Sequence, residues 1–158
     1  MKFGIVQGRL LPPVDDEVQA FPEQSWQKEF DLLEDAGVSY IEWIVTPKTV
    51  TSNPLLTYDL RSYPIKSICL DTIMDEEFCD RKFLDHAVVP FLESAIRNDI
   101  GLITVPLLEK SSILRFEAGD KFIEVFRDIL FEFPDLKFTL ETDLSEELLL
   151  EVLKKLNV

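Results

Sequence analysis

Residues 137–156 read KFTLETDLSEELLLEVLKKL and contain one strand, one loop and one helix in succession. The first five residues are rich in apolar and β-branched side chains, as in a strand of a buried sheet. Ser145 can cap the helix that follows, whose first turn is acidic and whose last turn is basic, as the helix dipole favours. The stretch therefore predicts a β-strand followed directly by an α-helix.

The same strand and helix unit recurs along the rest of the chain. Segments with the composition of strands alternate with segments whose apolar residues have helical spacing, and this alternation is typical of a parallel α/β sheet. Pro90 lies inside one helical segment, where it predicts a kink or a second helix start. The expected strands are residues 2–7, 40–45, 65–71, 102–108 and 137–141, and the expected helices are 26–36, 55–61, 83–98, 120–133 and 146 onward.

Two α/β topologies are built from such units. An open doubly wound sheet can be complete with five, whereas the eight-unit TIM barrel typically takes about 250 residues. The chain has 158 residues without a linker or a compositional break, so we expect one domain over residues 1–158. Its length favours the doubly wound sheet, while its loops favour parallel β/α units of the TIM-barrel type, about five of the eight.

Composition argues against several classes of protein. The net charge is −14, from 30 acidic and 16 basic side chains, and would repel a nucleic-acid backbone. Apolar runs stop at about five residues, far below the roughly 20 that span a bilayer. The first residues lack the features of a signal peptide, and Cys69 and Cys79 form no CxxC motif. We therefore expect a cytoplasmic protein with reduced cysteines that binds neither nucleic acid nor membrane.

Polar side chains, most of them carboxylates, follow the expected strands. The carboxyl ends of parallel strands meet at one edge of the sheet, where α/β proteins place their functional groups. Carboxylates that converge without a Cys or His cluster suit hard divalent cations such as Mg²⁺, or hydroxyl-rich ligands such as sugars. The strand ends carry Gln7, Arg9, Glu42, Asp71, Glu109, Glu141 and Asp143.

Each of these carboxylates also has a structural interpretation. Glu42 lies within an apolar strand and could form an interior ion pair with Arg9 or Lys66. Glu141 follows its strand directly and is the strongest candidate for a functional role. For Asp71 and Asp143 the alternative is a turn or loop-capping role, for which Asp is favoured. For Glu109 it is a solvated charge in a loop.

Other catalytic and binding motifs are missing from the sequence. The only histidine, His86, is expected on a helix away from the strand ends. This position argues against a nucleophilic triad that depends on histidine. Neither GxGxxG nor GxxxxGK[ST] occurs, so nothing indicates nucleotide binding through a glycine-rich loop.

Short motifs occur in a fixed order over nearly the whole chain: GIVQGRL (4–10), QAFP (19–22), IEWI (41–44), NPL (53–55), SICLD (67–71), VPLLEKSSI (105–113) and LETD (140–143). Each motif is weak by itself, but the ordered set is more specific. Together they resemble the sugar phosphate isomerase/epimerase family, whose fold is the xylose isomerase-like TIM barrel.

The resemblance implies a metal-dependent aldose–ketose isomerase or ketose 3-epimerase. In this family a divalent metal, for which Mn²⁺, Mg²⁺, Co²⁺ or Zn²⁺ would serve, holds neighbouring sugar oxygens while a glutamate removes the proton beside the carbonyl and an enediolate is reprotonated. Glu141 resembles the first metal-ligand glutamate, so we expect it to be both catalytic and metal-binding. The expected partner is a sugar or sugar phosphate, bound by Gln7, Arg9, Glu42, Asp71 and Glu109.

The sequence also departs from the family. The remaining metal ligands, an Asp, a His and a second Glu, come from strands six to eight of the barrel, which this sequence does not contain. We therefore expect a C-terminally truncated barrel with incomplete catalytic equipment, whose open sheet edges favour self-association. Two alternatives stay open: a complete five-unit doubly wound signalling or binding module, and a non-catalytic half-barrel that binds a partner through its edges.

Overall fold

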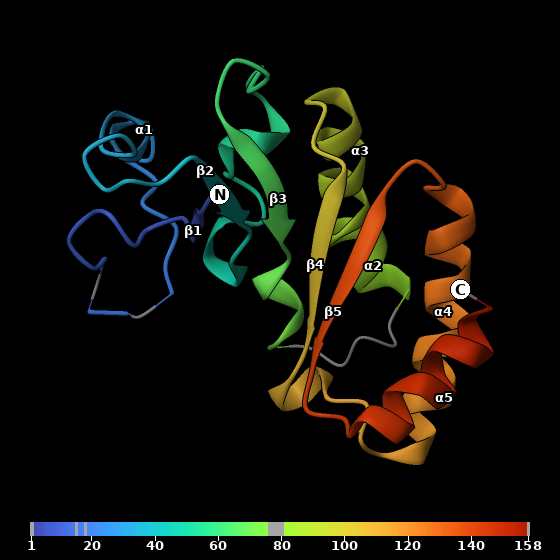
Figure 1. Ribbon diagram of the computed structural model, residues 1–158. Coiled ribbons are helices and arrows are strands. Elements are labelled where there is room, and N and C mark those ends of the chain that lie inside the picture. Colours follow the sequence, from blue (N-terminus) through green and yellow to red (C-terminus); the bar gives the residue numbers. More distant parts are fainter. Residues whose placement is uncertain (1, 15, 18, 76–80, 158) are drawn as a thin grey trace.

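Five parallel strands form one sheet in the computed structural model, which describes residues 2–14, 16–17, 19–75 and 81–157 (Figure 1). All neighbouring strands pair in parallel, and β4 and β5 stay in register from Leu102 opposite Lys137 to Leu107 opposite Thr142. The five expected strands are therefore confirmed. They are β1 (Gly4–Val6), β2 (Tyr40–Ile44), β3 (Ile65–Cys69), β4 (Leu102–Leu107) and β5 (Lys137–Thr142).

The order of the strands decides between the two expected topologies. The sheet runs β1-β2-β3-β4-β5, so every strand lies beside its neighbour in the chain. A doubly wound sheet instead reverses its strand order at a switch point. Sequential parallel strands joined by right-handed crossovers place the connecting helices on one face, as in a barrel. The structure therefore supports β/α units of the barrel type and excludes the doubly wound module.

Helices and short 3₁₀ turns connect the strands (Figure 1). No helix in the described part of the chain is long and apolar enough to cross a membrane. The α-helices are α1 (Lys28–Asp31), α2 (Arg81–Ala87), α3 (Val89–Arg97), α4 (Phe116–Glu132) and α5 (Glu146–Leu156); the 3₁₀ turns are η1 (Pro47–Thr49), η2 (Pro54–Leu56), η3 (Asp71–Ile73) and η4 (Glu109–Ser111).

Pro90 produces a second helix start, as its position predicted. Helix α2 ends at Ala87, and α3 begins at Val89 with the proline in its first turn. A proline there removes an N–H that would have no partner within the helix. Ser145 also caps α5 as expected, since its hydroxyl accepts a hydrogen bond from the Leu148 N–H.

Two expected helices are wrong in extent. The helix expected at 26–36 is α-helical only over Lys28–Asp31. Tighter turns follow, in which the Leu32 N–H donates to the carbonyl oxygen three residues back, while the Trp26 ring packs against Tyr63. The helix expected at 55–61 is only the 3₁₀ turn Pro54–Leu56. Ring packing shapes the first segment. In the second, the carbonyl oxygens of Leu55 and Leu56 accept hydrogen bonds from Arg97, so tertiary contacts override helical periodicity there.

The core lies between the sheet and the helices. Trp43, Ile68 and Ile103 occupy matching positions on neighbouring strands and are fully buried. They belong to the same apolar cluster as Phe91 of α3 and Phe122 of α4. Burial of side chains this large stabilises the fold by roughly 1.5–3 kcal/mol each. The apolar core of the chain therefore lies on the helix-facing side of the sheet.

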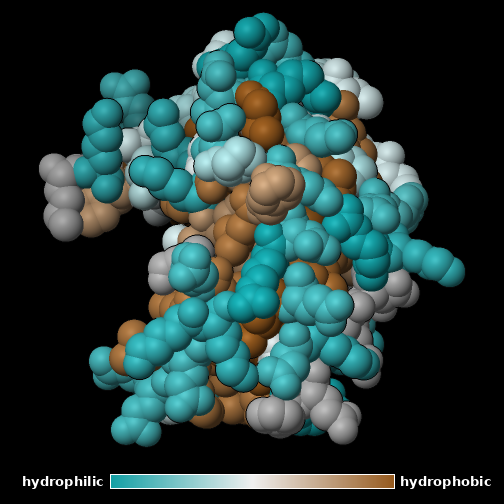
Figure 2. Space-filling view, turned by 90° about the vertical axis from the view of Figure 1, so that its right-hand side faces the viewer, coloured by the Kyte–Doolittle hydropathy of each residue, from teal (hydrophilic) through white to brown (hydrophobic). Residues whose placement is uncertain are grey.

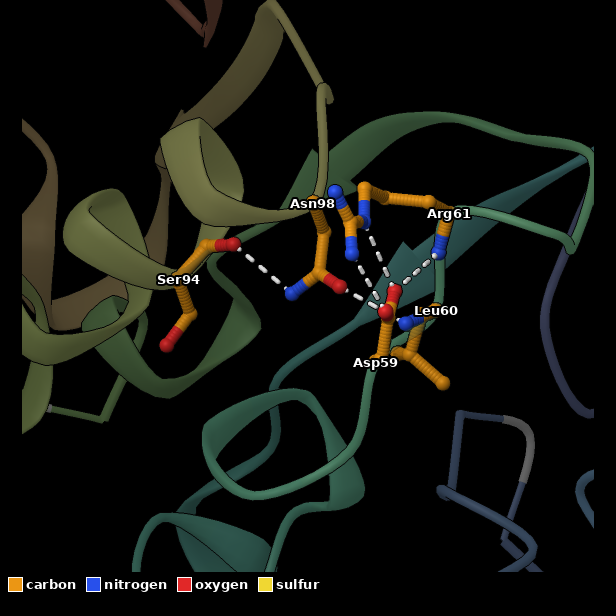
Figure 3. A network of polar contacts seen from close by, with 5 residues as sticks. All are labelled: Asp59, Leu60, Arg61, Ser94 and Asn98. Atoms are coloured by element: carbon orange, nitrogen blue, oxygen red, sulfur yellow. Dashed lines mark hydrogen bonds and ion pairs between the residues drawn. The ribbon is translucent and has the colours of Figure 1, made fainter.

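The Asn98 side chain forms two hydrogen bonds at the amino end of the sheet (Figure 3). Its side-chain oxygen accepts a hydrogen bond of 2.7 Å from the Leu60 N–H, and its amide nitrogen donates one of 2.9 Å to the Ser94 carbonyl oxygen. Asn98 and Leu60 are both buried. The side chain thus joins the end of α3 to the connection that precedes β3. Asp59 and Arg61, drawn beside it, form an exposed ion pair.

We expect Asn98→Ala to lower the free energy of unfolding by about 1–3 kcal/mol, because the buried Leu60 N–H loses its acceptor. Urea unfolding followed by circular dichroism would measure the change. The control is Asp59→Asn, which removes the exposed ion pair beside it and should leave stability within experimental error. Equal effects of the two substitutions would contradict the role given to Asn98.

Candidate functional site

Carboxylates from three consecutive strand ends meet at the carboxyl edge of the sheet. Asp71 follows β3, Glu109 follows β4 and Glu141 lies near the end of β5. The pKa of Asp71 is raised to about 6, first by burial and then by the negative charges of Asp75, Glu109 and Glu141. Each of these charges therefore lies near enough to act on the Asp71 carboxyl. The structure therefore brings these predicted residues into one acidic cluster.

The loop after β1 also reaches this cluster. The side-chain amide of Gln19 donates a hydrogen bond of 2.9 Å to a carboxylate oxygen of Asp71. This bond favours the ionised carboxylate and so lowers the pKa of Asp71, against the effects of burial and like charge. Gln19 thus joins the first and third β/α units across the strand ends.

Glu42 lies on the inner face of the sheet, below the strand ends. One of its carboxylate oxygens accepts hydrogen bonds from Ser67 at 3.0 Å and from Thr104 at 2.8 Å. The Thr104 hydroxyl lies 3.2 Å from that of Thr139 on β5. The expected ion pair of Glu42 with Arg9 or Lys66 is not among the contacts of the described residues. A row of hydroxyls crossing β3, β4 and β5 takes its place.

Cys69 connects the hydroxyl row with the acidic cluster. Its thiol is buried, and its pKa is raised by burial and then by the charges of Glu42, Asp71 and Glu141. A thiol in this environment stays protonated and is a poor nucleophile. The charges of these three carboxylates therefore all act on one buried thiol of β3. Cys79 lies outside the described residues.

Gln7 and Arg9 lie apart from these contacts. The Gln7 side chain is buried, and its backbone N–H donates to the Glu42 carbonyl oxygen at 3.0 Å. Its amide lies beside Glu29 and lowers the pKa of that carboxyl, although no hydrogen bond of ordinary geometry joins the two side chains. Arg9 is exposed in the turn after β1. Sugar binding by these two residues stays a prediction.

Asp143 has the loop-capping role that was its structural alternative. Both of its carboxylate oxygens accept hydrogen bonds from the Ser112 hydroxyl, at 3.0 and 3.1 Å. The contact joins the loop after β5 to the loop after β4. His86 is exposed on α2, as expected. It lines a cavity with Val50, Thr72 and Asp75, so it lies beside the segments that follow β2 and β3 rather than away from the strand ends.

A divalent metal does not fit the described residues by themselves. Within them, no three His, Cys, Asp or Glu side chains are placed to hold a metal ion. Glu141 is exposed and would supply only one ligand, whereas metal sites of oxygen ligands take about six. A metal at this edge would need further donors.

A cavity of about 460 Å³ lies beside the loop after β1. Its volume is in the range of small-molecule sites. The carboxylates of the acidic cluster do not line it, so it is not the centre of the candidate site. Its walls come from the loop and from the segment after β2, and include Val14, Glu17, Phe21, Thr46, Lys48 and Thr49.

Comparison with known proteins supports the fold. Neither a family model nor a curated protein sequence matches the chain. A solved structure of a xylose isomerase domain protein from Planctomyces limnophilus is similar, with a TM-score of 0.61 and 13% sequence identity. The similarity covers 99% of this chain and 59% of that protein. The chain thus has the α/β fold of a xylose isomerase-like barrel and spans just under three fifths of that protein's length.

We expect Asp71→Asn to stabilise the protein at neutral pH, by on the order of 1 kcal/mol for a half-buried group. The folded pKa is about 6 against an ordinary 3.8. The stability that the protonated carboxyl contributes is therefore complete below about pH 4 and lost as the pH rises through about 6. Urea unfolding below and above this window would measure the difference. An identical pH dependence in wild type and variant would contradict the acidic cluster, and exposed Asp135→Asn is the control.

Proposed function

We propose that the chain is the sugar-binding part of a barrel of the sugar isomerase/epimerase type, with residues 1–158 in one domain. The observation that carries the proposal is the placement of Asp71, Glu109 and Glu141 at the carboxyl ends of three sequential parallel strands. Functional groups of barrel enzymes lie at this edge. Sugars present many hydroxyl donors, and the cluster presents many acceptors.

The proposed reaction is proton transfer beside the carbonyl of a sugar or sugar phosphate. Glu141 is exposed at the end of β5 and would remove the proton as a general base. The resulting enediolate would be reprotonated at the neighbouring carbon in an isomerase, or on the other face in a 3-epimerase. Glu42, Asp71 and Glu109 would accept hydrogen bonds from sugar hydroxyls, and Gln7 and Arg9 would complete the pocket.

The divalent metal that the resemblance implies would stabilise the developing negative charge when bound. Glu141 would be one of its ligands, and the other donors would have to come in addition to the described residues. The residues of this chain are proposed to bind and orient the sugar and to exchange its proton.

We expect Glu141→Gln to reduce proton exchange at the sugar by about 100-fold or more, the usual contribution of a general base. The measurement is deuterium incorporation beside the carbonyl of D-fructose in D₂O by NMR, with and without Mn²⁺. Glu147→Gln, an exposed glutamate on α5, is the matched control and should exchange at the wild-type rate.

Two results would contradict the proposed function. One is a rate of exchange that Glu141→Gln leaves unchanged. The other is the absence of D-fructose-induced chemical shift changes at the residues following β3, β4 and β5. Chemical shift changes confined to the amino ends of the strands would contradict the proposed function in the same way.

A non-catalytic interaction role is the second candidate function, favoured by exposed apolar residues. Strands β1 and β5 are the edges of the sheet. Figure 2 looks onto the side of the molecule that carries α4 and α5 and shows apolar surface between the polar side chains. Exposed apolar residues on and near these helices are Leu114, Phe131, Leu148 and Leu150.

If this surface mediates self-association, sedimentation velocity should show a weight-average mass that rises with protein concentration. Leu148→Glu combined with Leu150→Glu places charge on α5 and should return the protein to a monomer. Lys154→Glu, on the same helix, is the control for added charge. A wild-type protein that sediments as a monomer at every concentration would contradict this candidate function.

A further inference from the structure

We infer that Glu29 is a positioning residue that acts through the loop after β1 on the carboxylate of Asp71. The inference rests on the proposed function, because it gives Asp71 a place in the site. Glu29 lies on α1 and Asp71 follows β3. A chain of contacts through Gly8, Ala20 and Gln19 connects them.

The first contact joins the Glu29 carboxylate to backbone N–H groups of the turn after β1. Glu29 has no exposed surface. Both of its oxygens accept from the Gly8 N–H at 2.8 Å, and one also accepts from the Leu10 N–H at 3.1 Å. Hydrogen bonds to an ionised acceptor are the stronger kind. Glu29 therefore fixes the turn of Gly8, Arg9 and Leu10 directly after β1.

The second contact is the close approach of Gly8 to the Ala20 carbonyl group. Gly8 has a φ of +90°, and a Cβ built there would lie 2.6 Å from the Ala20 carbonyl oxygen. Only glycine combines this backbone conformation with so close an approach. Gly8 and Ala20 thus lie side by side in the connection between β1 and α1, with Gln19 next to Ala20 in the chain.

The third contact joins Gln19 to Asp71 of the acidic cluster. Gln19 precedes Ala20 and donates its 2.9 Å hydrogen bond to Asp71. Glu29 holds Gly8, and Gly8 lies against the carbonyl group of Ala20, so a shift of Gly8 would displace the residue next to Gln19. A buried carboxylate is costly, as the raised pKa of Glu29 shows. An apolar residue would fill the same space without that cost, but it could not hold the two backbone N–H groups.

The test is the titration of Asp71, followed by NMR on protein with ¹³C-labelled aspartate. Glu29→Gln keeps the size of the side chain but turns an NH₂ group toward backbone N–H donors, so the turn loses part of its hold. We expect the pKa of Asp71 to rise above its value of about 6, because the ionised form loses the Gln19 hydrogen bond. Asp75, Glu109 and Glu141, which also act on Asp71, are unchanged in this variant.

Two further variants make the test independent of Glu29 itself. Gln19→Ala removes the last contact and should raise the pKa of Asp71 in the same direction. Gly8→Ala pushes the backbone away from Ala20 and should do the same if Glu29→Gln fails to fold. Asp31→Asn, an exposed residue on the same helix, should leave the titration at its wild-type position.

The double variant Glu29→Gln with Gln19→Ala separates positioning from a general loss of structure. If Glu29 acts through Gln19, the double variant titrates like Gln19→Ala alone. Additive shifts, or a Glu29→Gln protein that folds and titrates like wild type, would overturn the inference. No sugar enters this experiment, so a failure of D-fructose to bind would contradict the proposed function and leave the positioning role standing.

Discussion

Sequential parallel pairing of the strands is the constraint on which the rest of the structure depends. When each parallel strand lies beside the next one in the chain, every connection must return over the same face of the sheet. All carboxyl ends then meet at one edge, and all amino ends at the other. The helices, the apolar core and the acidic cluster take their places from this single pairing pattern.

The amino ends and the carboxyl ends of the strands differ in how their polar groups affect stability. At the amino end, Asn98 satisfies buried backbone groups with a neutral amide, so the contact stabilises the fold without introducing charge. At the carboxyl end, Asp71 lies among like charges that raise its pKa. Like charges held together destabilise the folded state. The amino end of the sheet therefore contributes stability, and the carboxyl end carries repulsion between carboxylates that lowers it.

The sequence predicted the strands and the acidic strand ends, because a parallel sheet leaves its mark within short segments. Runs of apolar and β-branched residues defined the five strands, and Pro90 marked the division between α2 and α3. The expected helix at 26–36 failed because ring packing between distant residues shapes that segment. The contacts of Glu29 and Gln19 could not be foreseen, since each joins residues 19 to 52 positions apart. The hydroxyl partners of Glu42 could have been suggested only by the shared inward face of Ser67 and Thr104.

The chemistry of the acidic cluster also bears on which part of a ligand can approach it. The raised pKa of Asp71 reflects lost hydration and repulsion from Asp75, Glu109 and Glu141. A ligand that donates hydrogen bonds, such as a sugar hydroxyl, restores part of the lost solvation and favours the ionised carboxylate. A phosphate group would add negative charge to the same place and disfavour it. If a sugar phosphate is the substrate, its hydroxyl-bearing carbons must therefore face this edge, and its phosphate must lie away from the ends of β3, β4 and β5.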